Sequence, residues 1–319
     1  MSLAASLFAL VSLAAVATHL SAARTPAAPY VLILGTAQDG GLPQIGCEEP
    51  HCERARRHPS KGRMVSSLLI CDPRSGKRWL IDASPDLPRQ VELAEGHPST
   101  RHPDGPRPPL FDGVFLTHAH VGHYAGLIHL GREAYGARNL PVFGTDRMRA
   151  FLEGNGPWSL LVDAGNIQLE VLRPDQAIEL APGLRITPFL VPHRDEFSDT
   201  VGFMIAGPSR TLMYLPDIDK WQQWSTSLED ALSRVDVALL DGTFFADGEV
   251  PGRAMSEIPH PFVSETLERL ASASAAERAK VLFTHLNHGN PLADPRSRAA
   301  SRVREAGMDV ARDGQIIDL

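Results

Sequence analysis

The segment Thr117-His118-Ala119-His120-Val121-Gly122-His123 is the most informative part of this chain. It follows an apolar run, residues 113–116, whose β-branched and aromatic side chains predict a buried strand. Residues 124–135 predict a helix. Three histidines between a strand and a helix can point several imidazoles at one place, and neutral imidazole is the commonest protein ligand for metals such as zinc. The stretch therefore predicts a metal site. The alternative is a solvated loop rich in histidine.

The composition fits one folded domain after a leader. The chain has 319 residues, of which 43% are hydrophobic, and this is ample for a large core. Its net charge is −7, without a run of five or more basic residues. These features argue against a dedicated nucleic-acid-binding surface and leave a small phosphodiester open as a substrate. Nothing resembling a linker divides the chain, so we expect one domain over residues 24–319.

The first 23 residues predict export from the cytoplasm. Residues 3–23 are apolar except for serines, Thr18 and His19, and they end in Ser21-Ala22-Ala23, which is typical of a signal peptide cleaved near Ala23. The start of the chain carries no Lys or Arg, and the run approaches the ~20 residues that span a bilayer, so an uncleaved anchor is the alternative. With cleavage, we expect a periplasmic or secreted protein without stable membrane association.

The chain has three cysteines, and two of them lie close together. Cys47 and Cys52 are separated by four residues, which allows a disulfide in an oxidising compartment. They can instead join His51 in a structural metal site. Cys71 lies among apolar residues and is expected to be a buried small hydrophobe.

The pattern along the chain predicts two sheets packed face to face with helices outside. We expect a loop over 36–64 that forms a lid held by the Cys47–Cys52 region. Strands are predicted at 30–34, 65–71, 78–83, 113–117, 140–143, 167–172, 184–191, 201–205, 211–215, 235–240 and 281–284, with a final pair near 309–319. Helices are predicted at 124–135, 146–152, 219–233, 263–272 and 295–306.

Further ligand-type residues stand where predicted strands end. They are His193, Asp217, Asp241 and His285. Sites built on several strand ends are rigid, as metal chemistry requires. Asp82 also ends a strand, and we expect its carboxylate to orient the histidine turn through hydrogen bonds. His288, close to His285, is expected to contact substrate or to support the ligands.

The order of these residues resembles the metallo-β-lactamase fold superfamily, and within it the pyrroloquinoline-quinone (PQQ) biosynthesis protein B group. The chain has His-x-His-x-x-His followed by a strand-end His, Asp and His, and the matching stretches are 35–47, 191–196, 240–245 and 285–291. The resemblance covers essentially everything after the leader. It implies an α+β fold, the four-layer αβ/βα sandwich of that superfamily.

The resemblance also implies a two-metal site with one or two zinc ions, for which iron or manganese can substitute. Its ligands would be His118, His120 and His193 for the first metal, His123 and His285 for the second, and Asp217 as the bridge. One departure matters, because the superfamily has Asp where this chain has Gly122. Asp219 is our candidate replacement. We further expect that restoring aspartate at 122 tightens binding of the second metal.

This site predicts a hydrolase. A hydroxide held on zinc is the natural nucleophile, since zinc lowers the pKa of bound water to about 7. Asp241 and His260 can form an acid–base pair that protonates the leaving group, as a comparable pair does in the related phosphodiesterases. The alternative is that His260, which lies between two prolines, is only a loop residue. We expect an ester or phosphodiester bond of a small molecule as the substrate.

Two other functions stay open at this stage. The first is a role in making or moving the PQQ cofactor, with iron and oxidative chemistry. The second is a non-hydrolytic binding or carrier protein whose site has decayed, as Gly122 would suggest. β-Lactamase activity has no support beyond the fold, and a fold does not fix a function.

Overall fold

The computed structural model describes residues 27–96, 109–250, 252 and 254–319. The predicted leader, residues 1–23, lies outside this part of the chain. Among the described helices, none combines the length and the apolar character needed to cross a membrane.

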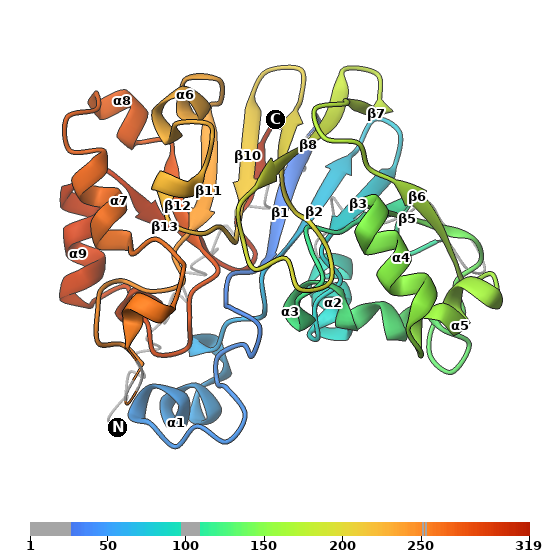
Figure 1. The fold of residues 1–319 in the computed structure, drawn as a ribbon, viewed down its shortest axis with the longest axis horizontal. Helices are drawn as coiled ribbons and strands as arrows, with labels where there is room; N and C mark the ends of the chain where they lie inside the picture. The colour runs from blue at the N-terminus through green and yellow to red at the C-terminus, as the bar shows by residue number, and fades with distance from the viewer. Residues whose placement is uncertain (1–26, 97–108, 251, 253) are drawn as a thin grey trace, which may run out of the picture.

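The described strands form two sheets of seven (Figure 1). The first sheet has the order β14-β1-β2-β3-β4-β5-β6. Its neighbours are antiparallel from β14 to β3 and parallel from β3 to β6. The strands are β1 (Tyr30–Gly35), β2 (Ser67–Asp72), β3 (Lys77–Ile81), β4 (Gly113–Phe115), β5 (Leu140–Gly144), β6 (Ile167–Val171) and β14 (Ile316–Asp318).

The second sheet repeats this plan with the order β13-β12-β11-β10-β9-β8-β7. Its neighbours are antiparallel from β7 to β10 and parallel from β10 to β13. The strands are β7 (Ile178–Ala181), β8 (Leu184–Val191), β9 (Thr200–Ala206), β10 (Thr211–Leu215), β11 (Val237–Asp241), β12 (Val281–Thr284) and β13 (Asp309–Val310).

Helices cover the outer face of each sheet, as Figure 1 shows. Those on the first sheet are α2 (Leu87–Glu95), α3 (Val121–Tyr124), the 3₁₀ helix η3 (Ala125–Leu130), α4 (Asp146–Gly154) and α5 (Trp158–Asp163). Those on the second sheet are α6 (Leu228–Ser233), α7 (Val263–Arg269), α8 (Ala275–Arg278) and α9 (Arg298–Glu305). α1 (Pro50–Arg57) lies apart from both layers. The other 3₁₀ turns are η1 (Pro59–Lys61), η4 (Trp221–Gln223), η5 (Met255–Glu257) and η6 (Pro291–Ala293).

Successive apolar side chains of a buried strand point to opposite faces of its sheet, and both faces are packed. In β1, Val31 and Ile33 pack between the two sheets, whereas Leu32 and Leu34 pack against the helices of the first sheet. Such continuous apolar strands are typical of sheets that are buried on both faces. The predicted four-layer αβ/βα sandwich is therefore confirmed.

Several sequence predictions of local structure are wrong. The segment 36–64 is not only loop, because it contains α1 and η1. The helix predicted over 219–233 is broken, because Ser227 caps a new helix by accepting a hydrogen bond from the backbone of Asp230. The final strands do not pair with each other. β13 joins β12 in the second sheet and β14 joins β1 in the first.

The helix predicted over 124–135 becomes α3 followed by η3. The reason is a close approach of two backbones, since a Cβ at Gly126 would lie only 2.0 Å from the carbonyl oxygen of Ser84. The amide of Gly126 also donates to the carbonyl of Ala83. Tertiary contact with the end of β3 therefore overrides the helical pattern of this segment.

Candidate metal centre

The histidine turn follows β4 and is held by Asp82, the residue after β3. The Asp82 carboxylate accepts hydrogen bonds from the Thr117 amide at 2.8 Å and from its hydroxyl at 2.9 Å, and it lies 2.7 Å from Nδ1 of His123. Asp82 itself has a positive φ of 63°, which turns the chain away from the strand. The predicted role of Asp82 in orienting the turn is confirmed by these contacts.

Three histidines and one aspartate form the first ligand group, with all their ligand atoms within 4.8 Å of one another. Its members are His118, His120, His193 and Asp217. His118 Nε2 lies 2.9 Å from His120 Nδ1, and His193 Nε2 lies 3.3 Å from the same nitrogen. Asp217 is close to both His193 Nε2 and His118 Nε2, at 3.3 and 3.4 Å. Imidazole nitrogens that face one another so closely suit a shared cation.

A second ligand group adjoins the first and contains His123, His285 and Asp39. The Nε2 atoms of His123 and His285 lie 3.8 and 3.7 Å from Asp217 Oδ2, so Asp217 stands between the two groups. Asp39 Oδ1 lies 3.9 Å from His123 Nε2. The sequence prediction did not include Asp39, because it lies in a loop and not at a strand end.

Unpartnered buried atoms test whether a metal fits here. Among the described residues, four of the buried polar side-chain atoms without a hydrogen-bond partner are Asp39 Oδ1, His123 Nε2, Asp217 Oδ1 and His285 Nε2. Buried polar groups in proteins are nearly always partnered. These four atoms belong to the two ligand groups, so the residues present fit a bound cation.

The Nδ1 atoms of His285 and His193, the ring nitrogens that are not directed at the other ligands, have partners that fix the orientation of each ring. His285 Nδ1 lies 2.9 Å from the Thr243 hydroxyl, which in turn donates to Asp241. His193 Nδ1 lies 3.0 Å from Asp219 Oδ1. Asp219 therefore supports the first group and is not the replacement ligand that we predicted for the second. The physical reason is that its amide donates to the carbonyl of Pro192, which draws the residue toward the end of β8.

The structure brings Asp241 and His260 together, as predicted. His260 Nδ1 lies 2.8 Å from Asp241 Oδ2 and 3.2 Å from Asp217 Oδ1, and the His260 side chain is buried. Asp241 also accepts hydrogen bonds from the amides of Ile218 and Thr243. The segment between the two prolines thus places His260 inside the site.

Burial and neighbouring charges separate the pKa values of the histidines. Burial, together with nearby histidines, lowers the pKa of His118 and His285 well below its usual value, so both imidazoles are neutral and able to bind a metal. Burial acts in the same direction on His123 and His260. For these two, carboxylates outweigh it, Asp82 most strongly for His123 and Asp241 for His260, and raise each pKa to about 9.

A separate group lies at α1 and contains Cys47, Cys52, His51 and His288, here called the Cys–His group. Both cysteines are free, so the disulfide alternative is not present in this structure. His51 Nε2 lies 3.2 Å from His288 Nδ1, and Cys52 Sγ lies 3.5 Å from the same atom. His288 was predicted as a neighbour of the main site and not as a partner of the cysteines. Only the fold brings it to them.

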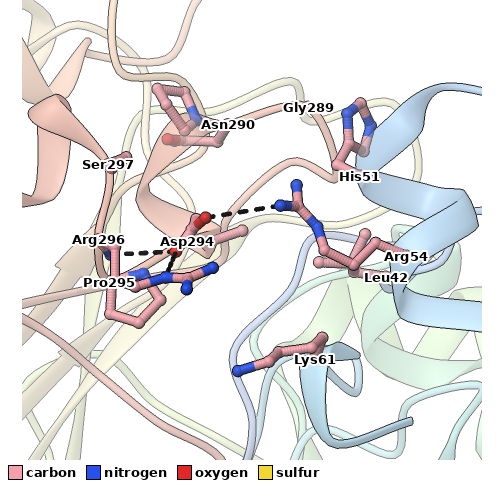
Figure 2. Close-up of a pocket in the computed structure, with 12 residues that line it drawn as sticks. Leu42, His51, Arg54, Lys61, Gly289, Asn290, Asp294, Pro295, Arg296 and Ser297 are labelled. Carbon is pink, nitrogen blue, oxygen red and sulfur yellow. Dashed lines mark hydrogen bonds and ion pairs between the residues drawn. The ribbon is translucent and has the colours of Figure 1, made fainter. Parts of the chain in front are cut away.

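α1 is joined to the segment that follows β12. Figure 2 shows His51 and Arg54 of α1 facing residues 289–297, with Arg54 directed at Asp294. Arg54 Nη1 lies 3.7 Å from Asp294 Oδ2. A neighbouring cavity of about 540 Å³ is lined by His260 of the main site and by His51 and His288 of the Cys–His group.

Comparisons with known proteins identify the family of this chain. The family described as the beta-lactamase superfamily domain matches residues 77–286. The coenzyme PQQ synthesis protein B of Methylobacterium radiotolerans is 30% identical over 91% of this chain and 99% of its own length. The protein of the same name from Methylobacterium nodulans is 31% identical over 90% of this chain and 99% of its own length.

Solved structures give the same result. The crystal structure of Zn²⁺-bound PqqB from Methylobacterium extorquens has a TM-score of 0.75 and 25% identity, and covers 91% of this chain and 100% of that one. A diphosphatase from the PhnP family has a TM-score of 0.63 and 20% identity, and covers 91% and 97%. The second similarity shows the fold alone.

Replacing Asp82 by asparagine tests the support of the histidine turn. The amide would present a donor to His123 Nδ1 and favour the tautomer that points a proton at the ligand group. We expect Asp82→Asn to weaken zinc binding by roughly 10- to 100-fold, the usual cost of losing such a partner, measured by titration calorimetry. Asp175→Asn is the matched control, because Asp175 has the same φ of 63° at an exposed turn. Equal zinc affinity in both variants would contradict the role of Asp82.

Proposed function

Because this chain belongs to the beta-lactamase superfamily, and within it to the family of coenzyme PQQ synthesis protein B, we propose that it is a metal-dependent hydrolase of a small ester or phosphodiester. One observation carries the proposal. The buried Asp217 of the first ligand group also lies 3.7 to 3.8 Å from the two histidines of the second, and His260 of the Asp241–His260 pair contacts the same carboxylate. A site with only a structural metal would not need this buried acid–base pair beside it.

The residues have distinct roles in this proposal. Those that would hold the first ion are His118, His120, His193 and Asp217, and those nearest the second are His123 and His285, with Asp217 shared. A bound zinc ion would supply an activated water and a Lewis acid. The ligand set contains only nitrogen and oxygen, which also suits iron and manganese. Zinc is favoured by the related PqqB structure, which is described as Zn²⁺-bound.

His260 is proposed to protonate the leaving group. With a pKa of about 9 it carries a proton at neutral pH. Its Nδ1 is engaged by Asp241, so the proton available to a substrate is the one on Nε2. His260 lines the cavity of about 540 Å³, which is within the usual range for small-molecule sites. Arg194 also lines that cavity and would favour an anionic substrate.

A second candidate function comes from the relatives' name. Proteins at least 30% identical to this chain are called coenzyme PQQ synthesis protein B, so an oxidative step with iron in the same site is the rival proposal. The predicted export of this chain favours hydrolysis over a cytoplasmic biosynthetic step. A non-hydrolytic carrier would bind metal without any turnover.

The Cys–His group is proposed to be a structural zinc site. It offers two thiols and two imidazoles, a common tetrahedral set for structural zinc. Burial lowers the pKa of both His51 and His288, so these imidazoles are neutral at pH 7 and free to bind. The ion would join α1 to the segment after β12, next to the Arg54–Asp294 ion pair.

The double variant His118→Ala/His120→Ala tests the metal centre. We expect loss of the zinc bound in the first ligand group and of hydrolysis of bis(p-nitrophenyl) phosphate and p-nitrophenyl acetate, because two of the first ion's ligands are gone. Metal analysis and initial rates measure both. His58→Ala is the control, because His58 is an exposed histidine outside both ligand groups. Unchanged zinc content in the double variant would end the hydrolase proposal. Oxygen uptake after anaerobic reconstitution with Fe²⁺ would instead favour the oxidative rival.

The variant His260→Gln tests the proton donor. We expect kcat to fall by about 10²–10⁴-fold for substrates with basic leaving groups and much less for p-nitrophenyl esters, whose leaving group needs no proton. Zinc content should not change. A merely structural histidine would lower the rates of both substrate classes by the same factor, and that outcome would refute the assignment.

The double variant Cys47→Ser/Cys52→Ser tests the Cys–His group. We expect the loss of about one equivalent of zinc and a lower melting temperature, since structural zinc contributes directly to folding. Zinc in the main centre should remain. Cys71→Ser is the control for the loss of a buried thiol, because Cys71 lies in β2 away from this group. The same zinc content in all three proteins would contradict the site.

A further inference from the structure

Asp39 packs directly against Gly122, in the space that a side chain at position 122 would need. A Cβ built on Gly122 would lie 2.1 Å from Asp39 Oδ1 and 2.8 Å from Asp39 Cα. Neither distance is compatible with a side chain at position 122, and the second involves backbone that cannot swing away. The space that the superfamily fills with an aspartate at position 122 is therefore filled by the side chain of Asp39 instead.

The Asp39 carboxylate is placed to bind a cation in that space. Its Oδ1 is buried and has no hydrogen-bond partner among the described residues, although 30% of the side chain is exposed. This oxygen lies 3.9 Å from His123 Nε2 and forms one ligand group with His123 and His285. The Nε2 atoms of both histidines are also buried and unpartnered in the described structure. These three unpartnered atoms therefore form one group that suits a single cation.

The backbone on both sides of Asp39 is fixed. The Gln38 amide donates to the carbonyl of Leu286, and the Gln38 side chain accepts a hydrogen bond of 2.8 Å from Asn287. The Gly41 amide then closes a turn onto the Gln38 carbonyl, with a φ of 67° that glycine adopts readily. The loop after β1 is therefore tied to the residues that follow His285. A ligand on such a support is held in place before the metal binds.

We propose that Asp39 is the carboxylate ligand of the second metal, and that it replaces, from a different part of the chain, the aspartate missing at position 122. This inference rests on the proposed metal centre and completes it. The second ion is held by Asp39, His123 and His285, with Asp217 shared. Gly122 is then a requirement of the site and not a sign of decay.

The expectation that aspartate at 122 tightens the second site is accordingly wrong for the single variant. Gly122→Asp places a second carboxylate against Asp39, and one of the two must be displaced together with backbone. The double variant Asp39→Gly/Gly122→Asp removes the clash with the Asp39 side chain and returns a carboxylate to the histidine turn. The 2.8 Å approach to the Cα atom of residue 39 remains, so that loop must still shift slightly. It is therefore the reciprocal exchange, and its remaining clash is smaller than that of Gly122→Asp alone.

Equilibrium dialysis with Mn²⁺ alone tests this exchange in the full mature chain after metal removal. Mn²⁺ prefers nitrogen and oxygen ligands and leaves the thiols of the Cys–His group unfilled, so the count reports the main centre. We expect the wild type to bind two ions. Asp39→Asn should weaken binding of the second ion by at least about 100-fold and leave the first unchanged, because losing a direct ligand costs no less than losing a residue that only supports one. The exposed Glu48→Gln is the control for charge removal in the same loop.

The remaining variants decide between explanations. Gly122→Asp should bind the second ion no better than Asp39→Asn does, and the double variant should bind it more tightly than Gly122→Asp does. Wild-type binding of both ions by Asp39→Asn would overturn the proposal, as would equal loss of both ions, or tighter second-ion binding by Gly122→Asp alone. If the double variant does not fold, as judged by circular dichroism, the near-isosteric Asp39→Asn still decides. If the metal centre itself is wrongly assigned, His118→Ala/His120→Ala will keep its full metal content. That result is distinct from any result with the Asp39 and Gly122 variants.

Discussion

The burial of one carboxylate, that of Asp217, is the constraint on which the site depends. Asp217 is 3% exposed, and its oxygens lie between 3.2 and 3.8 Å from imidazole nitrogens of five histidines. A buried carboxylate is costly unless a charge of opposite sign pairs with it. Protonated His260, 3.2 Å away, supplies part of that charge, and the neutral His118 and His285 leave nitrogens free to bind a metal ion. A bound cation would add to this pairing and so contribute to the stability of this region as well as to its chemistry.

The two sheets bring these side chains together because the strands that carry them end at the same edge of the sandwich. β10, β11 and β12 are parallel, so Asp217, Asp241 and His285 come together where these strands end. β8 and β10 are both antiparallel to β9, which brings His193 to the same edge. In the first sheet, the parallel pair β3 and β4 delivers Asp82 and the histidine turn. Each half of the sandwich thus contributes one side of the metal centre.

The segment between β1 and β2 links the main centre to the Cys–His group. Asp39 lies near its start, and Cys47, His51 and Cys52 lie in its middle. Residues after β12 complete both places, since His285 belongs to the main centre and His288 to the Cys–His group. The predicted lid is therefore a folded segment with two points of attachment. It also lines the cavity in which His260 is found.

The strands and the ligand-type residues at their ends could be predicted from the sequence, because both are local signals. Buried strands show as short apolar runs, and a polar residue at the end of such a run is visible without the fold, as with His193 and His285. Which distant backbones meet depends on the folded chain and could not be predicted in this way. Contact with Ser84 broke the predicted helix at Gly126, and Asp219 was drawn to His193. Asp39 and His288 acquired their places from segments that are remote in sequence. A loop residue has no periodic pattern to mark it, so its role depends on long-range packing that only the folded chain defines.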